Sequence, residues 1–261
     1  LQHYGHYSKT TYYRFYLFDC EPLRRYLALD QNTFKQPIIS PASDRSIMVQ
    51  FNEEISEYIH QQVHFYSTLL LENHDDKISN LSPAYNSILI RLKEGVSLWR
   101  TIAKLKQLFS ENHEIKVADK TRIKLPVCYE GEFAPDLARV ASHTGLSIEQ
   151  IIHKHTTGKY LIYFLGFSPG FPYVGGMDPN LETPRLESPR TIVPAGSVAI
   201  GGKQTGIYPI QSPGGWNIIG RTPLTLFNWN QAKTPALPMG AAIEFYPITK
   251  EEFHDNQESL F

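Results

Sequence analysis

Glycine and proline gather in one part of this 261-residue chain. Residues 158–247 hold 13 of the 17 Gly and 12 of the 18 Pro, but only 10 of the 51 charged residues (25 basic and 26 acidic) and none of the ten His. Proline breaks helices, so long helices are excluded from this segment, and short apolar stretches between Gly and Pro turns are typical of a closed or nearly closed β-barrel. The chain is therefore predicted to divide into two parts of different structural type.

Residues 39–130 have the apolar spacing of an α+β domain. Apolar residues recur every three or four positions in two segments, which predicts helices, and alternate or run together in four shorter ones, which predicts strands. The helical segments are 55–71 and 98–109, and the strands are 46–51, 78–81, 87–92 and 122–128. The resulting order, β-α-β-β-α-β, predicts a ferredoxin-like N-terminal domain ahead of the barrel.

The remaining segments are assigned from composition and capping signals. Residues 131–157 contain two short helical stretches, with Gly145 after the first and a Ser147–Gln150 capping box before the second. The pair resembles a DNA-binding helix-turn-helix, but the chain lacks the basic surplus that phosphate contacts need, so we interpret it as a helical linker. We expect an extension of uncertain order over 1–38, a barrel domain over 158–248 and a polar, frayed tail over 249–261.

The overall composition limits the classes of function. The net charge of -1 argues against nucleic acid as a partner. No run of about 18 apolar residues exists, so no transmembrane helix and no membrane partner are expected. Cys20 and Cys128 are too few for a disulfide scaffold or a thiolate metal site. We therefore predict a cytoplasmic protein without a metal site.

Two familiar motifs fail when their chemistry is considered. Residues 166–170 match G-x-S-x-G, but the oxyanion hole of that motif needs the N–H of the residue after the serine, and Pro169 has none. Gly202-Lys203 is part of a possible phosphate loop, but Ser197 and Gln204 stand where the motif needs Gly and Ser or Thr. Neither a self-contained serine hydrolase nor a Walker-type nucleotide site is expected.

A group of turns remains in the Gly-rich segment. Residues 201–206 and 212–216 allow the backbone to approach a ligand or a partner closely. Gln204 and Arg221 are the polar groups expected at a site for a carbonyl or a carboxylate. Alternatively, the turns are barrel corners and Arg221 pairs with a carboxylate such as Glu182. The residues alone leave both interpretations open.

An ordered series of motifs in the barrel segment, with shorter ones before it, resembles a known family. The motifs are Pro126–Tyr129, Phe133–Leu137, His143–Ser147, Leu165–Gly176, Pro184-Arg185, Pro189-Arg190, Val193–Val198, Gln204–Pro209, Ser212–Trp216 and Gly220–Pro223. They resemble the family of 5-oxoprolinase B subunits, also called allophanate hydrolase subunit 1 or KipI-like (carboxyltransferase domain, subdomain C and D), and the resemblance as a whole covers about residues 39–248. The resemblance implies an α+β domain followed by a cyclophilin-like β-barrel.

The resemblance also implies a function and two alternatives. Most members resemble the B subunit of an ATP-dependent 5-oxoprolinase, a hydrolase complex that opens 5-oxo-L-proline to L-glutamate together with an A subunit and a C subunit. One branch of the family inhibits a sporulation sensor histidine kinase. A third relation is the carboxyltransferase part of urea carboxylase and allophanate hydrolase. On the first interpretation the chain is inactive alone and ATP is used by the complex.

The first interpretation assigns roles to residues of the barrel, in a site shared with the C subunit. The catalytic candidates are Gln204 and Arg221, and the substrate-binding candidates are Tyr208, Gly214, Gly215 and Trp216. On the kinase-inhibitor interpretation, a groove for the partner is expected from Phe167, Phe171 and Tyr173. The same aromatic side chains also suit packing in a barrel core.

Overall fold

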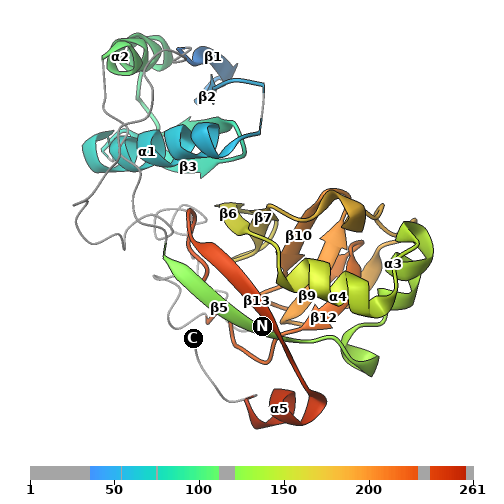
Figure 1. Cartoon of the computed structure of the whole chain (residues 1–261). Coiled ribbons are helices and arrows are strands. Elements are labelled where there is room, and N and C mark those ends of the chain that lie inside the picture. The colour runs from blue at the N-terminus through green and yellow to red at the C-terminus, as the bar shows by residue number, and fades with distance from the viewer. Residues whose placement is uncertain (1–35, 54, 75, 112–120, 229–235, 257–261) are drawn as a thin grey trace, which may run out of the picture. The chain divides into compact units, whose positions relative to one another are not determined.

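The computed structural model describes residues 36–53, 55–74, 76–111, 121–228 and 236–256 (Figure 1). The chain divides into two compact units, Leu1–Asp119 and Lys120–Phe261. Among the described residues, no helix is both long enough and apolar enough to cross a membrane.

The first unit is an antiparallel sheet covered by two helices. Its strands are β1 (Ile38–Ser43), β2 (Ser46–Gln50), β3 (Ile78–Pro83) and β4 (Ser87–Leu92), in the order β1-β2-β4-β3. Its helices are α1 (Glu57–His74), which packs on β3 and β4, and α2 (Leu98–Ser110), which packs on β1 and β2. In β4 the alternate residues Ile88, Ile90 and Leu92 are buried, as expected for a sheet with one covered face.

The ferredoxin-like order is not confirmed, because the strand predicted last in the first domain belongs to the barrel. This strand, β5 (Arg122–Cys128), pairs in parallel with β13 (Ala242–Ile248) over all seven residues. The last four residues of β5 are all buried, although alternate residues of a strand face opposite sides. A strand covered on both faces suits a barrel with outer helices, so the first domain ends before β5 and not at residue 130.

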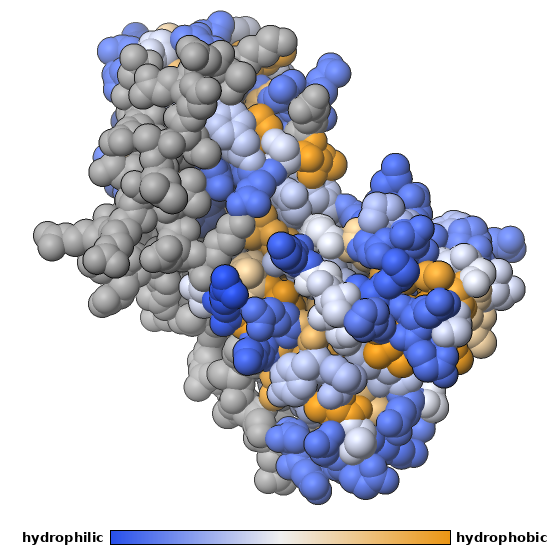
Figure 2. Space-filling view, in the orientation of Figure 1, coloured by the Kyte–Doolittle hydropathy of each residue, from blue (hydrophilic) through white to orange (hydrophobic). Residues whose placement is uncertain are grey.

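The second unit is built around a closed barrel with the strand order β10-β7-β6-β13-β5-β12-β9. Its further strands are β6 (Tyr160–Leu165), β7 (Pro172–Gly175), β9 (Ser197–Gly201), β10 (Gln204–Ile207) and β12 (Asn217–Arg221). A separate two-stranded sheet consists of β8 (Arg190–Val193) and β11 (Ser212–Gly214). The predicted barrel is thus confirmed. In Figure 2, apolar side chains reach the surface of this unit in separate areas between polar ones.

The segment predicted as a linker, 131–157, is part of the barrel unit. It forms a short 3-10 turn, η4 (Gly131–Phe133), and the helices α3 (Leu137–Thr144) and α4 (Ile148–Thr156), which pack on β12 and β13 respectively. Gly145 ends α3 in the left-handed conformation (φ 73°), and Ser147 and Gln150 form the expected capping box of α4. Because these helices bury apolar side chains against the barrel, they cover it rather than connect two domains.

The predicted polar tail begins with an ordered helix, α5 (Lys250–Asp255). Thr249 and Glu252 form a capping box, and Phe253 is buried against Phe133 with ring centroids 4.2 Å apart. One buried aromatic ring and a complete cap hold this helix to the barrel, which the polar composition concealed. Residues 257–261 of the predicted tail, and 1–35 of the predicted extension, lie outside the described residues.

Candidate functional site

Five aromatic side chains meet in the barrel unit, and we call them the aromatic cluster. They are Phe167, Phe171, Tyr173, Tyr208 and Trp216. Phe171 is central, because its ring centroid lies 5.1 Å from that of Tyr208, 5.3 Å from Tyr173, 5.5 Å from Phe167 and 5.6 Å from Trp216, all at steep interplanar angles. Four of the five are buried or half-buried, whereas Phe167 is 63% exposed. The cluster is therefore both barrel core and, at Phe167, surface.

Glycines allow the backbone to pass close to these rings. A Cβ at Gly214 would overlap with the Tyr208 hydroxyl, and a Cβ at Gly201 or Gly206 would press on the Trp216 ring. Gly215 accepts a hydrogen bond from the Leu186 N–H (2.7 Å), which fixes the loop before β8 against the same segment. The predicted substrate-binding residues Tyr208, Gly214, Gly215 and Trp216 are thus brought together by the fold.

Two arginines that the sequence analysis did not single out lie at this cluster. The Arg185 guanidinium carbon lies 5.7 Å from the centre of the Trp216 ring. Arg190 is the Cα partner of Gly214 in the β8–β11 sheet, and its Nη2 is 2.7 Å from Asp136 Oδ1. The second oxygen of Asp136 accepts a hydrogen bond from the Ile218 N–H (2.7 Å), so the carboxylate holds Arg190 in one orientation. The motif pairs Pro184-Arg185 and Pro189-Arg190 carried this signal in the sequence.

The Tyr208 phenol lies in the field of both arginines. Burial raises the pKa of this phenol, and the effect outweighs the hydrogen bond from the Trp216 backbone N–H and the charges of Arg185 and Arg190, which act in the opposite direction. The phenol is therefore protonated at neutral pH. Its oxygen accepts from Trp216, so its proton is the part of the group suited to bind an acceptor on a ligand.

Several polar atoms near the cluster have no hydrogen-bond partner among the described residues. They include Arg190 Nη1, Ser168 Oγ and Ser212 Oγ, all shielded from solvent. Ser212 lies two residues before Gly214, and Ser168 follows Phe167. Buried polar atoms in folded proteins are almost always hydrogen-bonded, to protein or to ordered water, so these three atoms make the region a candidate for binding a ligand or water.

The turn that carries Phe167 is strained. Phe167 has φ 65°, the single positive value for a residue other than Gly in the part of the chain that the structure describes. The Ser168 N–H donates to the Gly166 carbonyl (2.7 Å), and the turn joins strand β6 to strand β7. A nucleophile elbow joins a strand to a helix, so the geometry does not match that motif. A bulky residue in this conformation is more typical of a ligand-binding loop.

The two predicted catalytic residues are not brought together. In the pairing of β9 with its neighbours, Gln204 lies opposite Gly201, while Arg221 lies opposite Ser197. Four residues of strand separate these positions by about 13 Å. Gln204 stays beside the aromatic cluster, because its partner Gly201 packs on the Trp216 ring.

Arg221 has structural contacts instead. Its Nε donates to the Ala195 carbonyl (2.8 Å), and its guanidinium carbon lies 5.9 Å from the centre of the Phe253 ring in α5. Burial lowers the pKa of this guanidinium. The alternative that Arg221 pairs with Glu182 is not confirmed, since no ion pair joins these two described residues.

A histidine enters the barrel unit from α4, although the Gly-rich segment contains none. His155 is fully buried, and its Nδ1 lies 2.8 Å from the Tyr129 hydroxyl and its Nε2 3.1 Å from Thr205 Oγ1. Thr205 donates to the Ala199 carbonyl, so it accepts from Nε2–H, and Tyr129 donates to Nδ1. Burial lowers the pKa of His155 to about 3. The helical spacing from Ile151 to His155 placed both on one face and could have revealed its burial.

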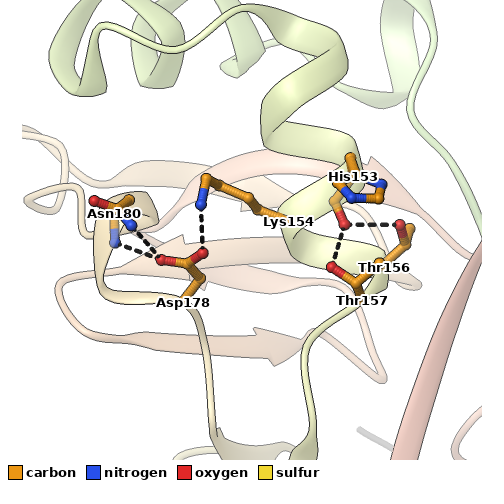
Figure 3. Close-up of polar contacts among 6 residues, drawn as sticks. All are labelled: His153, Lys154, Thr156, Thr157, Asp178 and Asn180. Carbon is orange, nitrogen blue, oxygen red and sulfur yellow. Dashed lines mark hydrogen bonds and ion pairs between the residues drawn. The ribbon is translucent and has the colours of Figure 1, made fainter.

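We call Tyr129, His155, Thr205 and the Ala199 carbonyl the histidine network. The helix that supplies His155 is held by an ion pair between Lys154 and Asp178, with Nζ and Oδ2 2.7 Å apart (Figure 3). Asp178 also accepts from the N–H and the side-chain amide of Asn180, and the contact with Lys154 and these two bonds lower the pKa of the Asp178 carboxyl. Every polar side-chain atom of the network is partnered, so the network supports the fold and offers no free base.

The tight turn of Gly201–Gln204 joins two barrel strands. Gly202 has φ 64° there, and no helix follows within the turn, so the backbone cannot form the strand–loop–helix cradle that holds phosphates. The described residues therefore do not form a phosphate loop at this position.

Comparison with known proteins gives the relatives of the chain. Residues 37–238 match the family described as carboxyltransferase domain, subdomain C and D. The 5-oxoprolinase B subunit of Bacillus subtilis (strain 168) is 37% identical over 84% of this chain and 96% of its own length. The protein of the same name from Escherichia coli O157:H7 is 43% identical over 63% of this chain and 76% of its own length.

Solved structures agree with this relationship. The structure of TTHA0988 is 32% identical with a TM-score of 0.68, over 78% of this chain and 40% of that one. The Kluyveromyces lactis urea carboxylase has a TM-score of 0.67 over 91% of this chain and 24% of that one, and at 22% identity it shows the fold alone. The family match spans most of the chain, and the chain therefore belongs to the carboxyltransferase domain, subdomain C and D family, together with the 5-oxoprolinase B subunits.

Proposed function

We propose that this chain is the B subunit of an ATP-dependent 5-oxoprolinase, a cytoplasmic complex that hydrolyses 5-oxo-L-proline to L-glutamate with an A subunit and a C subunit. The observation that carries the proposal is the 37% identity to a 5-oxoprolinase B subunit over nearly its whole length. The urea carboxylase relation supports the proposal less, because identity there falls to 22%. The barrel is, in this proposal, of the cyclophilin-like type.

Within the complex, we assign the substrate-facing surface of this chain to the aromatic cluster. A small lactam acid has a flat ring, a carbonyl and a carboxylate, so it needs an apolar wall and hydrogen-bond donors. Trp216 and Phe167 supply rings, Tyr208 supplies a hydroxyl proton, and Gly214 and Gly215 allow close approach of the backbone. We propose that the C subunit closes the site, because this chain offers no free base in the described part of the cluster.

Gln204 and Arg221 lie opposite different ends of β9, so we assign them different roles. Gln204 remains a candidate for the site, whereas Arg221 is better suited to hold α5 through Phe253 and the Ala195 carbonyl. Substitution of Arg221 by Ala should then lower the stability of the chain and leave the KM of the complex for 5-oxo-L-proline unchanged. A KM raised tenfold without loss of stability would return Arg221 to the site.

The nucleotide is assigned to the partner subunits. The turn at Gly201–Gln204 does not fit a phosphate loop, so we derive no step through ATP on this chain. ATP would supply the activation of the lactam carbonyl elsewhere in the complex.

The test is reconstitution. The chain is co-expressed with the A and C subunits, and ATP hydrolysis that depends on 5-oxo-L-proline is measured together with glutamate. We expect activity from the three proteins together, and none from this chain alone or from the A and C subunits without it. Full activity of the A and C subunits alone would overturn the proposal. An inactive assembled complex, combined with inhibition of sensor histidine kinase autophosphorylation by this chain, would favour the kinase-inhibitor alternative.

A further inference from the structure

We infer that Arg190, assisted by Arg185, binds the carboxylate of a small cyclic amide acid against the aromatic cluster. The identity of the ligand rests on the proposed function, and 5-oxo-L-proline is the representative of its class. The two arginines thereby replace Arg221 as the carboxylate-binding residues of the chain.

The first observation is the division of the Arg190 guanidinium into two halves. Nη2 is 2.7 Å from Asp136 Oδ1, whereas Nη1 is shielded from solvent and has no partner among the described residues. Asp136 is itself fixed by the Ile218 N–H. One edge of the guanidinium is therefore positioned by the protein, and the other presents donors to an acceptor that the described chain does not supply. A carboxylate is the acceptor that such a fork binds best.

The second observation is the charge around this edge. Asp136 balances Arg190, but Arg185 forms no ion pair within the described residues and contacts the Trp216 ring. Glu182 and Glu187, the acidic residues of the same segment, are exposed and pair with neither arginine. The cluster thus keeps one uncompensated positive charge, and a monocarboxylate neutralises it.

The third observation is a surface that suits the lactam ring of the ligand. Phe167 is exposed in a strained turn, with its ring centroid 6.4 Å from that of Tyr208. The Ser168 and Ser212 hydroxyls are buried without partners among the described residues. A five-membered lactam has one ring to pack on an aromatic wall and one N–H and one C=O to satisfy such hydroxyls. Arg185 is exposed and contacts the Trp216 ring, so it adds a positive charge at the edge of this surface.

The experiment measures two quantities with the same variants. Calorimetric titration of the full chain with 5-oxo-L-proline gives affinity, and the reconstituted complex gives the KM for the same compound. The variants are Arg190→Gln, Arg190→Lys and Arg185→Gln, with Lys124→Gln in β5 as the control for loss of an exposed positive charge elsewhere on the barrel. The probe 2-pyrrolidinone has the ring without the carboxylate.

We expect Arg190→Gln to weaken binding or raise KM at least tenfold, Arg190→Lys to restore part of the loss, and Arg185→Gln to cost about two- to fivefold. Lys124→Gln should match the wild type, and 2-pyrrolidinone should bind equally poorly to the wild type and to Arg190→Gln. Thermal unfolding identifies variants that fail to fold, and the exposed position of Arg185 makes it the variant least affected by that problem.

The outcomes separate this inference from the proposed function. An active complex whose KM is unchanged in Arg190→Gln and Arg185→Gln overturns the carboxylate site and leaves the function standing. An inactive complex with a chain that binds 5-oxo-L-proline through Arg190 overturns the function and leaves the site standing. A chain that neither binds the compound nor supports its hydrolysis overturns both.

Discussion

Two groups of polar side chains in the barrel unit, each with atoms shielded from solvent, differ in one respect. In the histidine network, His155, Tyr129 and Thr205 each have a partner for every polar side-chain atom. At the aromatic cluster, Arg190 Nη1 and the Ser168 and Ser212 hydroxyls have none within the described residues. A buried polar atom without a partner costs about 1–3 kcal/mol. On this contrast rests our proposal that the second group binds a ligand, whereas the first stabilises the fold.

The backbone also differs between these two regions. His155 of the histidine network lies on α4, which begins with a complete capping box and is held by the Lys154–Asp178 pair. The aromatic cluster includes Phe167, whose positive φ costs about 1 kcal/mol or more. Strain and unsatisfied donors thus occur in the same region, whereas the supporting network has neither. The following variants test whether the histidine network contributes mainly to stability and the aromatic cluster mainly to binding.

The largest effect is expected from His155→Ala. The substitution leaves a cavity beside Phe245, whose ring centroid lies 4.5 Å from that of His155, and it removes the partner of Tyr129. We expect a loss of about 4 kcal/mol in the free energy of unfolding, measured by urea denaturation. His153→Ala, on the exposed face of the same helix, is the control and should change stability by less than about 0.5 kcal/mol. Equal losses of unfolding free energy in the two variants would show that the buried His155 contributes no more to stability than the exposed His153.

A smaller effect is expected from acid. Burial lowers the folded-state pKa of His155 to about 3, below the value of about 6.5 in the unfolded chain. The unfolded chain therefore binds a proton first, so the contribution of His155 is complete above pH 6.5 and is lost as the pH falls toward 3. Between pH 6.5 and pH 5, wild type should lose about 2 kcal/mol more than His155→Gln. Parallel pH profiles for the two proteins would contradict this account.

Phe167→Gly should change stability by less than about 0.5 kcal/mol. Glycine relieves the positive φ, while its greater freedom in the unfolded chain offsets the gain. The exposed ring contributes to ligand contact instead, so affinity for 5-oxo-L-proline should fall severalfold. Phe167→Leu keeps an apolar side chain and should retain part of the affinity. A large loss of stability in Phe167→Gly would identify the ring as core.

The local sequence pattern predicted where helices and strands lie better than it predicted which strands pair. The sequence indicated helices over 55–71 and 98–109, close to α1 and α2, and a strand over 122–128 with the bounds of β5. It could not place β5 in the barrel, because β5 pairs with β13 more than a hundred residues later. The sequence predicts a frayed tail where α5 forms, because the segment is polar and its one buried side chain, Phe253, gives no periodic apolar pattern, although Thr249 and Glu252 form a capping box.

The site was predicted in part for the same reason. Tyr208, Trp216 and the glycines between them lie close in sequence, so their motif indicated a shared site. The joint catalytic role of Gln204 and Arg221 stays a prediction, and strand register, which no local pattern gives, separates the two residues by the length of β9. Arg190 belongs to the motif Pro189-Arg190, but its unpartnered Nη1 is a property of three-dimensional packing.

Removal of one hydroxyl at each of the two places tests the central claim most directly. Thr205→Val deletes a partnered hydroxyl of the histidine network, and Ser212→Ala deletes an unpartnered one near the aromatic cluster. For both variants, the free energy of unfolding and the affinity for 5-oxo-L-proline are measured. We predict that Thr205→Val loses about 1–3 kcal/mol and keeps its affinity, whereas Ser212→Ala keeps or gains stability and binds more weakly. Equal losses of stability with unchanged affinity in Ser212→Ala would contradict the account.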